Sequence, residues 1–212
     1  MLLLETQYLP ALAWCSAVWH EKTVALDAAE HYQKGSLRNR CHVAGPNGPQ
    51  RLSIPLVKGK HQQTSIREVR ISYEEPWQRQ HWRTIQAAYG NAPYFEHYAD
   101  LIHPFYEKPW AFLFDYNLDF LEIILKKKLG WPGELVLQTE FFPDGKWSQG
   151  KDLRGAIGGN MGECPVWFTP TRYAQVFEER TGFLPNLSVL DLLFCCGKTG
   201  TEVLAEPLFL PN

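Results

Sequence analysis

The beginning of the chain alternates apolar and polar positions in short blocks that are typical of strands. Residues 1–5 form a short apolar run, residues 11–20 are rich in Ala and Leu and compatible with a helix, and residues 23–27 form a β-branched run. Such a β-α-β beginning favours a parallel sheet with a right-handed crossover. Because ligands of open parallel sheets gather at the carboxyl ends of the strands, residues 7–10 and Asp27 are candidate site segments.

The residues that follow keep the short period of strands. Two alternating runs flank residues 45–49, which contain two glycines and two prolines and are typical of a hairpin turn. The apolar positions of residues 66–72 predict a further strand. We therefore expect residues 1–75 to be mainly sheet.

From Trp77 onward the apolar positions recur at helical spacing. Residues 77–89 predict a helix, and residues 95–106 predict a second one that Pro104 interrupts. Residues 112–129 carry the clearest apolar stripe, and three lysines and a following glycine mark the C-terminal end of this predicted helix. Residues 76–130 are therefore predicted to be helical.

The last third of the chain is predicted to contain a strand, a long loop and two helices. Residues 131–142 predict a strand, and residues 143–165 hold six glycines without clear periodicity, so they predict a long loop. Residues 171–180 and 187–197 predict two final helices, the second capped by Ser188 with Asp191. The whole pattern predicts one domain over residues 1–212, of class α/β or α+β, with a β-α-β start, a mixed sheet and a helical C-terminal half.

Charge and composition narrow the possible classes of partner. The 21 Lys and Arg against 23 Asp and Glu give a formal charge of −2, which argues against a general electrostatic grip on nucleic acid. Any anion site must then be local. The longest apolar segments, 118–125 and 187–196, are shorter than a membrane span, and the N-terminus lacks the pattern of a signal peptide. We expect a cytoplasmic protein whose five cysteines are mostly buried free thiols.

One local concentration of cations stands out between residues 31 and 41. If this stretch is extended, Lys34, Ser36, Arg38 and Arg40 lie on one face, because side chains alternate along a strand. Guanidinium groups bind phosphate or carboxylate through paired hydrogen bonds, so such a face predicts an anion site. The alternative is a solvated edge strand that its charges protect from aggregation.

Four further residues are candidates for chemistry. His81 is the candidate general base, because imidazole exchanges a proton near neutral pH; a structural histidine is the alternative. Asp27 can hold a substrate hydroxyl or orient a base, or it can be a turn carboxylate. Tyr8 and Tyr32 can stack on a sugar or base, or simply pack in the core.

Other motifs are weak. Asp115, Asn117 and Asp119 are spread around a helix, and no glycine of a calcium loop follows them, so we predict no metal. The Gly-rich residues 155–162 lack the preceding strand and ordered spacing of a dinucleotide fingerprint, and the Gly-Lys-Thr at 197–199 lacks the first glycine of a phosphate loop. The sequence identifies no cofactor.

Several pieces of the chain together resemble one family. They are QYLP near the start, YQKGSLRNRC, GPNGPQRLSIPL, WQRQHWRTIQAAYGNAPYF, LFDYNLDFL and QVFEERTGFLPNLSVLDLLFCCG. In this order, over nearly the whole chain, they are similar to the WbqC-like family and to its Bacteroidetes-type branch. The chain departs from the family pattern at Glu5 and Thr6, where many members have Gln-Pro, and at Cys195 and Cys196, where relatives often have Asn and an acidic residue.

The resemblance implies a role in the synthesis of bacterial surface polysaccharide such as O-antigen, and some relatives carry the label of transferase, including glycine transferase. Our first hypothesis is a transferase that acts on a phosphate-bearing donor, either a nucleotide sugar or an activated acyl group or amino acid. Its predicted catalytic residues are His81 and Asp27. Its predicted ligand-binding residues are Tyr8, Tyr32, Lys34, Arg38, Asn39 and Arg40. The alternatives are a non-catalytic module that binds an anion or nucleotide, and a structural subunit of a polysaccharide assembly complex.

Overall fold

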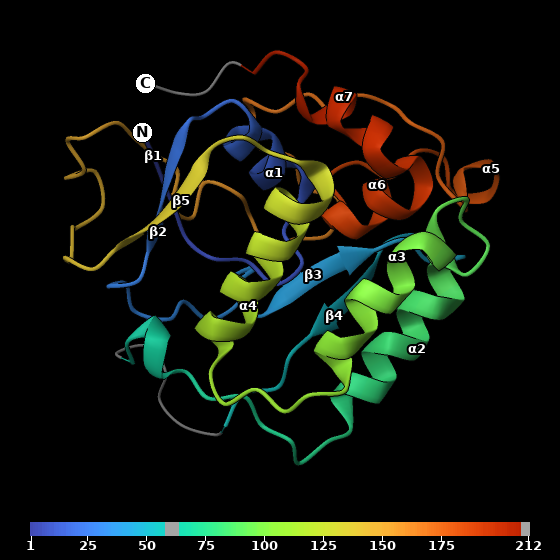
Figure 1. The fold of residues 1–212 in the computed structure, drawn as a ribbon, viewed down its shortest axis with the longest axis horizontal. Helices are drawn as coiled ribbons and strands as arrows, with labels where there is room; N and C mark the ends of the chain where they lie inside the picture. Colours follow the sequence, from blue (N-terminus) through green and yellow to red (C-terminus); the bar gives the residue numbers. More distant parts are fainter. Residues whose placement is uncertain (58–63, 209–212) are drawn as a thin grey trace.

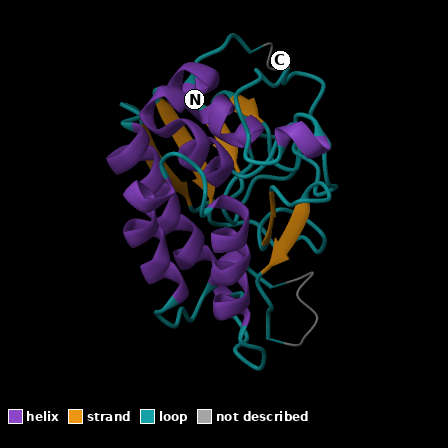
Figure 2. Ribbon diagram, turned by 90° about the vertical axis from the view of Figure 1, so that its right-hand side faces the viewer, coloured by secondary structure: helices purple, strands orange, loops and turns teal. Residues whose placement is uncertain are grey.

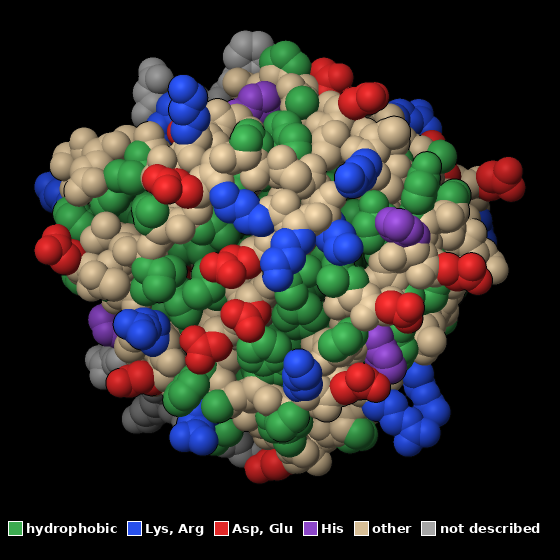
Figure 3. Space-filling model, in the orientation of Figure 1, with side chains coloured by type: hydrophobic (Ala, Val, Ile, Leu, Met, Phe, Trp, Pro, Cys, Tyr) green, Lys and Arg blue, Asp and Glu red, His purple; other side chains and the backbone are tan. Residues whose placement is uncertain are grey.

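The fold combines a parallel sheet, a separate hairpin and a set of helices (Figure 1). A computed structural model of the chain describes residues 1–57 and 64–208. It confirms the predicted α/β class and the concentration of helices in the C-terminal half. Charges of both signs are interspersed over the face that carries α4 (Figure 3).

The main sheet has four parallel strands in the order β5-β2-β1-β6. Its strands are β1 (Leu2–Leu4), β2 (Thr23–Asp27), β5 (Glu134–Gln138) and β6 (Lys151–Asp152). Helix α1 (Leu12–Trp19) connects β1 to β2, which confirms the predicted β-α-β start. The short strand β6 lies within the predicted loop over 143–165 and pairs with β1. The carboxyl ends of all four strands therefore meet at one edge of the sheet.

The two faces of the sheet are covered differently. Alternate residues such as Leu2, Leu4 and Leu26 are fully buried in the main core, as expected for a period of two. Leu3 and Ala25 face the other way and are covered by Trp147 of the long loop. Figure 2 shows most of the loops gathered on the side opposite the long helices. The segment after β5 therefore closes the second face of the sheet.

The predicted hairpin is confirmed, whereas the strand predicted after it is wrong. Strands β3 (Arg40–Val43) and β4 (Gln50–Ser53) pair antiparallel. Residues 66–72 instead contain a 3₁₀ turn, η2 (Ile66–Glu68). Their backbone bonds go to several partners, with the Ile66 amide donating to Glu30 and the Ile71 amide donating to Ala111. Single bridges to scattered partners cannot build a ladder, so no strand forms there.

The helices follow the predicted pattern except at one place. Those in the middle of the chain are α2 (Trp77–Tyr89), α3 (Phe95–Ile102), η3 (His103–Tyr106), α4 (Leu113–Leu121) and the π-helical η4 (Glu122–Leu129). Those at the end are α5 (Glu178–Thr181), α6 (Val189–Cys196), η5 (Gly197–Thr199) and α7 (Gly200–Leu204). Ser188 caps α6 by accepting a hydrogen bond from the Leu190 amide, as predicted. Across residues 1–57 and 64–208, no helix is long and apolar enough to cross a bilayer.

The predicted helix over 171–180 is wrong except for its last turn. The side chains of Tyr173 and Gln175 both bond to the buried Asp191 carboxylate on α6, at 2.6 and 2.9 Å. The Gln175 amide side chain also donates to the Leu184 carbonyl. These side-chain bonds hold residues 171–177 in an irregular path along α6, so only α5 is helical.

Candidate functional site

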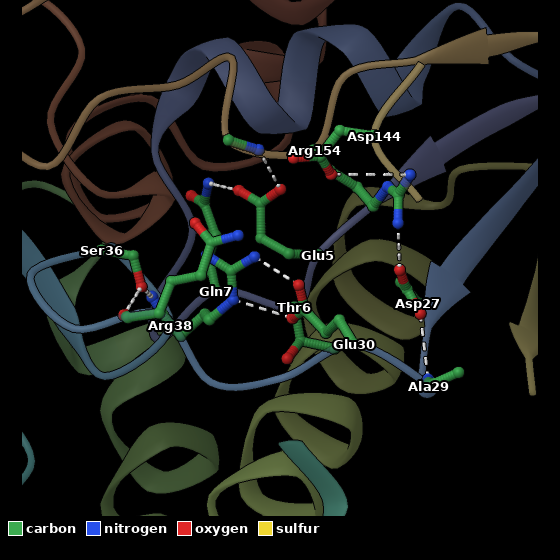
Figure 4. A network of polar contacts seen from close by, with 12 residues as sticks. Glu5, Thr6, Gln7, Asp27, Ala29, Glu30, Ser36, Arg38, Asp144 and Arg154 are labelled. Carbon is green, nitrogen blue, oxygen red and sulfur yellow. Dashed lines mark hydrogen bonds and ion pairs between the residues drawn. The ribbon is translucent and has the colours of Figure 1, made fainter. Parts of the chain in front are cut away.

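A network of buried charges lies at the carboxyl edge of the parallel sheet (Figure 4). The chain leaves β1 at Glu5, β2 ends at Asp27, and β6 ends at Asp152 and leads to Arg154. Glu30 and Arg38, from the segment between β2 and β3, complete what we call the sheet-edge network. Asp27, from the strand end that the sequence singled out, lies in this network, and Gln7 contacts it through Glu5.

Arg154 connects two of the strand ends. Its guanidinium donates from Nη1 to Asp27 Oδ2 at 2.7 Å, and from Nε and Nη2 to the two oxygens of Asp152 at 2.9 and 2.6 Å. Its side chain is only 5% exposed. Burial alone would raise the pKa of Asp152, but the hydrogen bonds and charge of Arg154 outweigh burial and hold that pKa below its ordinary value. Arg154 is therefore a positioning residue that locks the strand ends together.

Arg38 and Glu30 form the second ion pair of the network. The guanidinium donates from Nε to Glu30 Oε1 at 2.7 Å and from Nη2 to Glu30 Oε2. The side chains are 1% and 6% exposed. Burial raises the pKa of Glu30 to about 7; Arg38 opposes this rise, and the negative charges of Glu5 and Asp27 add to it. Glu30 is thus a carboxyl group poised to titrate near neutral pH.

Glu5 ties the loop after β6 to the end of β1. Its Oε2 accepts a hydrogen bond from the Gly155 amide at 2.9 Å, and its Oε1 accepts one from Gln7 Nε2 at 3.0 Å. Glu5 is only 2% exposed. Glu5 therefore adds a buried negative charge beside the two arginine pairs.

A cavity of about 260 Å³ opens next to this network, and we call it the sheet-edge pocket. Its lining residues are Glu30, His31, Tyr32, Gln33, Phe141, Asp144 and Arg154. The buried side chains of Glu30 and Arg154 form its charged floor, whereas Phe141 at 58% exposure and Asp144 at 95% side-chain exposure stand at its rim. The rings of His31 and Phe141 lie 5.9 Å apart. The pocket thus combines aromatic walls with a polar, charged floor.

The predicted one-sided row of cations over residues 34–40 is not formed. Gly35 has a φ of 88°, so the chain turns there, and the regular strand begins only at Arg40. Lys34 is exposed, Arg38 is buried against Glu30, and Arg40 is partly buried with Nη1 donating to the Gly35 carbonyl at 3.4 Å. The three cations therefore have three different environments.

Asn39 and Tyr32 support the loop that carries Arg38. The Tyr32 hydroxyl donates to Asn39 Oδ1 at 3.0 Å, and Asn39 Nδ2 donates to the Ile54 carbonyl at 2.8 Å. Asn117 of α4 donates to the Arg38 carbonyl at 2.8 Å. Asn39 is therefore a positioning residue, while Tyr32 contributes to the wall of the sheet-edge pocket.

Tyr8 and His81 belong to a separate buried cluster. The Tyr8 hydroxyl is 2.9 Å from His81 Nδ1 and 3.0 Å from the Tyr106 hydroxyl. Burial lowers the pKa of His81 to about 4, although a hydrogen bond with the Ser53 backbone opposes this shift. Neither Tyr8 nor His81 lines the sheet-edge pocket. The structure thus brings Asp27 to Arg154 but does not bring His81 to either of them.

Sequence reasoning missed four residues of the network, namely Glu5, Glu30, Asp152 and Arg154. Glu30 follows Asp27 by three positions and could have been found as part of the same strand-end segment. Asp152 and Arg154 lie in a region whose glycines predict only a loop. Within the described part of the chain, no group of three or more His, Cys, Asp or Glu residues is arranged to hold a metal ion.

Comparison with known proteins supports the resemblance. The chain is 28% identical over 195 residues to the uncharacterized protein Rv1507c of Mycobacterium tuberculosis, covering 82% of this chain and 83% of that protein. No solved structure matches the chain. The WbqC-like protein family matches residues 6–160, a range that includes both arginine pairs of the sheet-edge network. The chain therefore belongs to the WbqC-like protein family.

Proposed function

We propose that this protein is a transferase whose sheet-edge pocket binds part of a phosphate-bearing donor in the synthesis of bacterial surface polysaccharide. The observation that carries the proposal is the position of the pocket. It opens at the carboxyl edge of a parallel sheet, where such folds bind ligands, and it lies directly over the buried pair of Glu30 and Arg38 and over Arg154. The family's association with O-antigen synthesis supports the biological setting.

Glu30 is the proposed general base. It lines the pocket, and its pKa near 7 allows it to accept a proton at neutral pH. In the transfer, the hydroxyl or amine of the acceptor attacks the transferable carbon of the donor and gives its proton to Glu30. The bond between that carbon and the phosphate oxygen breaks, and the phosphate leaves with the electron pair. His81 fits this role less well. It is hydrogen-bonded to the buried Tyr8, and its pKa of about 4 makes it a weak base at neutral pH.

Lys34 is the proposed partner of the leaving phosphate. It is exposed and follows Gln33, which lines the pocket, whereas the guanidinium of Arg38 is buried, is paired with Glu30 and does not line the pocket. A cation placed where negative charge develops stabilises the transition state. Asp27, in contrast, acts through Arg154 and is a positioning residue in this proposal.

A panel of donors tests the proposal by thermal shift. Nucleotide sugars, nucleotides, acyl phosphates and amino acids activated as phosphate anhydrides are added to the wild type and to Lys34→Ala, with the exposed Lys127→Ala on η4 as a matched control. A ligand at about 100 times its Kd stabilises the fold by about 2.7 kcal/mol, which raises Tm by several degrees. One donor class should shift the wild type and Lys127→Ala equally and Lys34→Ala less. If no donor class shifts the wild type, the proposal fails.

A non-catalytic binding module is the second candidate. The observation in its favour is that both oxygens of Glu30 already accept hydrogen bonds from Arg38, an arrangement that also suits a purely structural ion pair. The two candidates differ in turnover. Release of free nucleotide or phosphate that depends on an acceptor supports the transferase, whereas tight donor binding without release supports the module.

A further inference from the structure

We propose that the sheet-edge pocket selects a substrate group that carries a positive charge, such as the ammonium of an amino sugar or amino acid. This inference rests on the proposed function, because it names the part of the substrate that this same pocket takes. Three features of the pocket favour a cation: the balance of charge, the occupied donors of the arginines and the aromatic lining.

Negative charge exceeds positive charge at this edge of the sheet. The sheet-edge network contains four carboxylates, those of Glu5, Asp27, Glu30 and Asp152, against the two guanidinium groups of Arg38 and Arg154. At the rim, Asp144 adds another carboxylate, with its Oδ1 3.9 Å from Arg154 Nη2. Burial is the main cause of the raised pKa of Glu30, and the negative charges of Glu5 and Asp27 add to it, as expected from the same excess. A cation that enters the pocket relieves this repulsion, whereas an anion increases it.

The arginines have little capacity left for an anion. A guanidinium has five N–H donors, and Arg154 uses four of them on Asp152, Asp27 and the Phe142 carbonyl. The remaining group lies toward Asp144. Arg38 is buried under Glu30 and does not line the pocket. A phosphate in the pocket would therefore meet at most one unoccupied guanidinium donor beside several carboxylates.

The walls of the pocket suit an organic cation. Phe141 presents an exposed ring 5.9 Å from that of His31, and Tyr32 also lines the pocket. An ammonium group close to an aromatic face is attracted by the negative face of the ring. The carboxylates of Glu30 and Asp144 can accept its hydrogen bonds. The phosphate of the same substrate must then point outward, to the side where Lys34 is exposed.

Isothermal titration of three related probes tests the inference. The probes are glucosamine 1-phosphate, glucose 1-phosphate and N-acetylglucosamine 1-phosphate, which differ only in the substituent at one carbon. They are compared at a pH that keeps the free amine protonated. We expect glucosamine 1-phosphate to bind about tenfold more tightly than the other two probes, which corresponds to about 1.4 kcal/mol in the free energy of binding. In Asp144→Asn this preference should shrink to about twofold, because an exposed ion-pair partner is lost.

The Asp144 side chain is 95% exposed, so its substitution should leave the fold intact. Asp115→Asn, at an exposed position on α4, is the matched control and should keep the full preference. Equal binding of the three probes, or tighter binding of glucose 1-phosphate, overturns the inference and leaves the proposed function standing. If none of the probes binds and no donor of the thermal-shift panel binds either, the proposed function fails and the inference fails with it.

Discussion

At the scale of single residues, burial decides what each titratable side chain can do. The same process that raises the pKa of Glu30 lowers the pKa of His81, because burial disfavours the charged form in both cases. Glu30 borders a pocket, whereas His81 is enclosed by Tyr8 and other aromatic rings. Two residues with perturbed pKa values therefore have different expected roles, one in chemistry and one in the core.

His81 should make the fold sensitive to acid. Its pKa in the folded protein is about 4, below its ordinary value of 6.5. Between these two values the unfolded chain binds a proton that the folded protein does not, so stability present above pH 6.5 is lost as the pH falls toward 4. The loss should approach about 3 kcal/mol. Urea unfolding at several pH values should show that His81→Gln loses less stability than wild type as the pH falls from 6.5 to 4, whatever Glu30 contributes to both, while the exposed His97→Gln keeps the wild-type slope. Equal slopes for all three proteins would contradict this reading.

Arg154 should be essential for stability because its removal leaves two carboxylates without their ion-pair partner. In Arg154→Ala the buried Asp27 and the half-buried Asp152 lose their partner, and breaking such a pair typically costs about 3–5 kcal/mol. Arg172→Ala removes an ion pair with Glu178 whose arginine is 72% exposed, and it should cost much less, because water screens an exposed pair. Denaturant unfolding measures both. A loss in Arg154→Ala no larger than in Arg172→Ala would show that the network does not hold the strand ends.

At the scale of elements, the ends of strands and helices place the functional groups. The parallel pairing of β1 with both β2 and β6 brings Glu5, Asp27 and Asp152 to one edge, although they are far apart in the chain. At the opposite edge of the sheet, Gly130 stops η4 in a left-handed conformation just before the chain enters β5. The sheet therefore depends on elements that stop at defined residues.

Gly130→Ala tests this dependence. Its φ of 76° is a conformation that side chains disfavour, and a Cβ there would meet no atom within 4 Å, so any loss reflects backbone strain alone. We expect a loss of about 1 kcal/mol in the free energy of unfolding. Gly130→Asn should lose less, because Asn tolerates the left-handed region. If Ala and Asn are equally harmless, the left-handed helix end does not matter for stability.

At the scale of the whole molecule, the sequence predicted the edge of the sheet at which the buried network lies better than it predicted the residues that form the network. The β-α-β start and the strand-end rule led to residues 7–10 and Asp27. The structure brings Gln7 and Asp27 into the sheet-edge network, whereas Tyr8 lies in the separate cluster with His81. Arg154 was not predictable in this way, because the two residues of β6 are too few to show a period. Arg38 was predicted to lie on one anion-binding face with Lys34 and Arg40, but the turn at Gly35 and the carboxylate of Glu30, eight positions away, bring it inside. Contacts of this kind depend on tertiary structure, which a local pattern does not contain.

The most direct test of the central claim is the affinity of the donor identified in the panel for Phe141→Ala. Phe141 is an exposed wall of the sheet-edge pocket, so its truncation should remove stacking without unfolding the protein. Measured by isothermal titration, Phe141→Ala should bind that donor about fivefold to tenfold more weakly than wild type, while Val166→Ala, at another exposed apolar position, should bind it as wild type does. Unchanged affinity in Phe141→Ala would place donor binding somewhere other than the sheet-edge pocket.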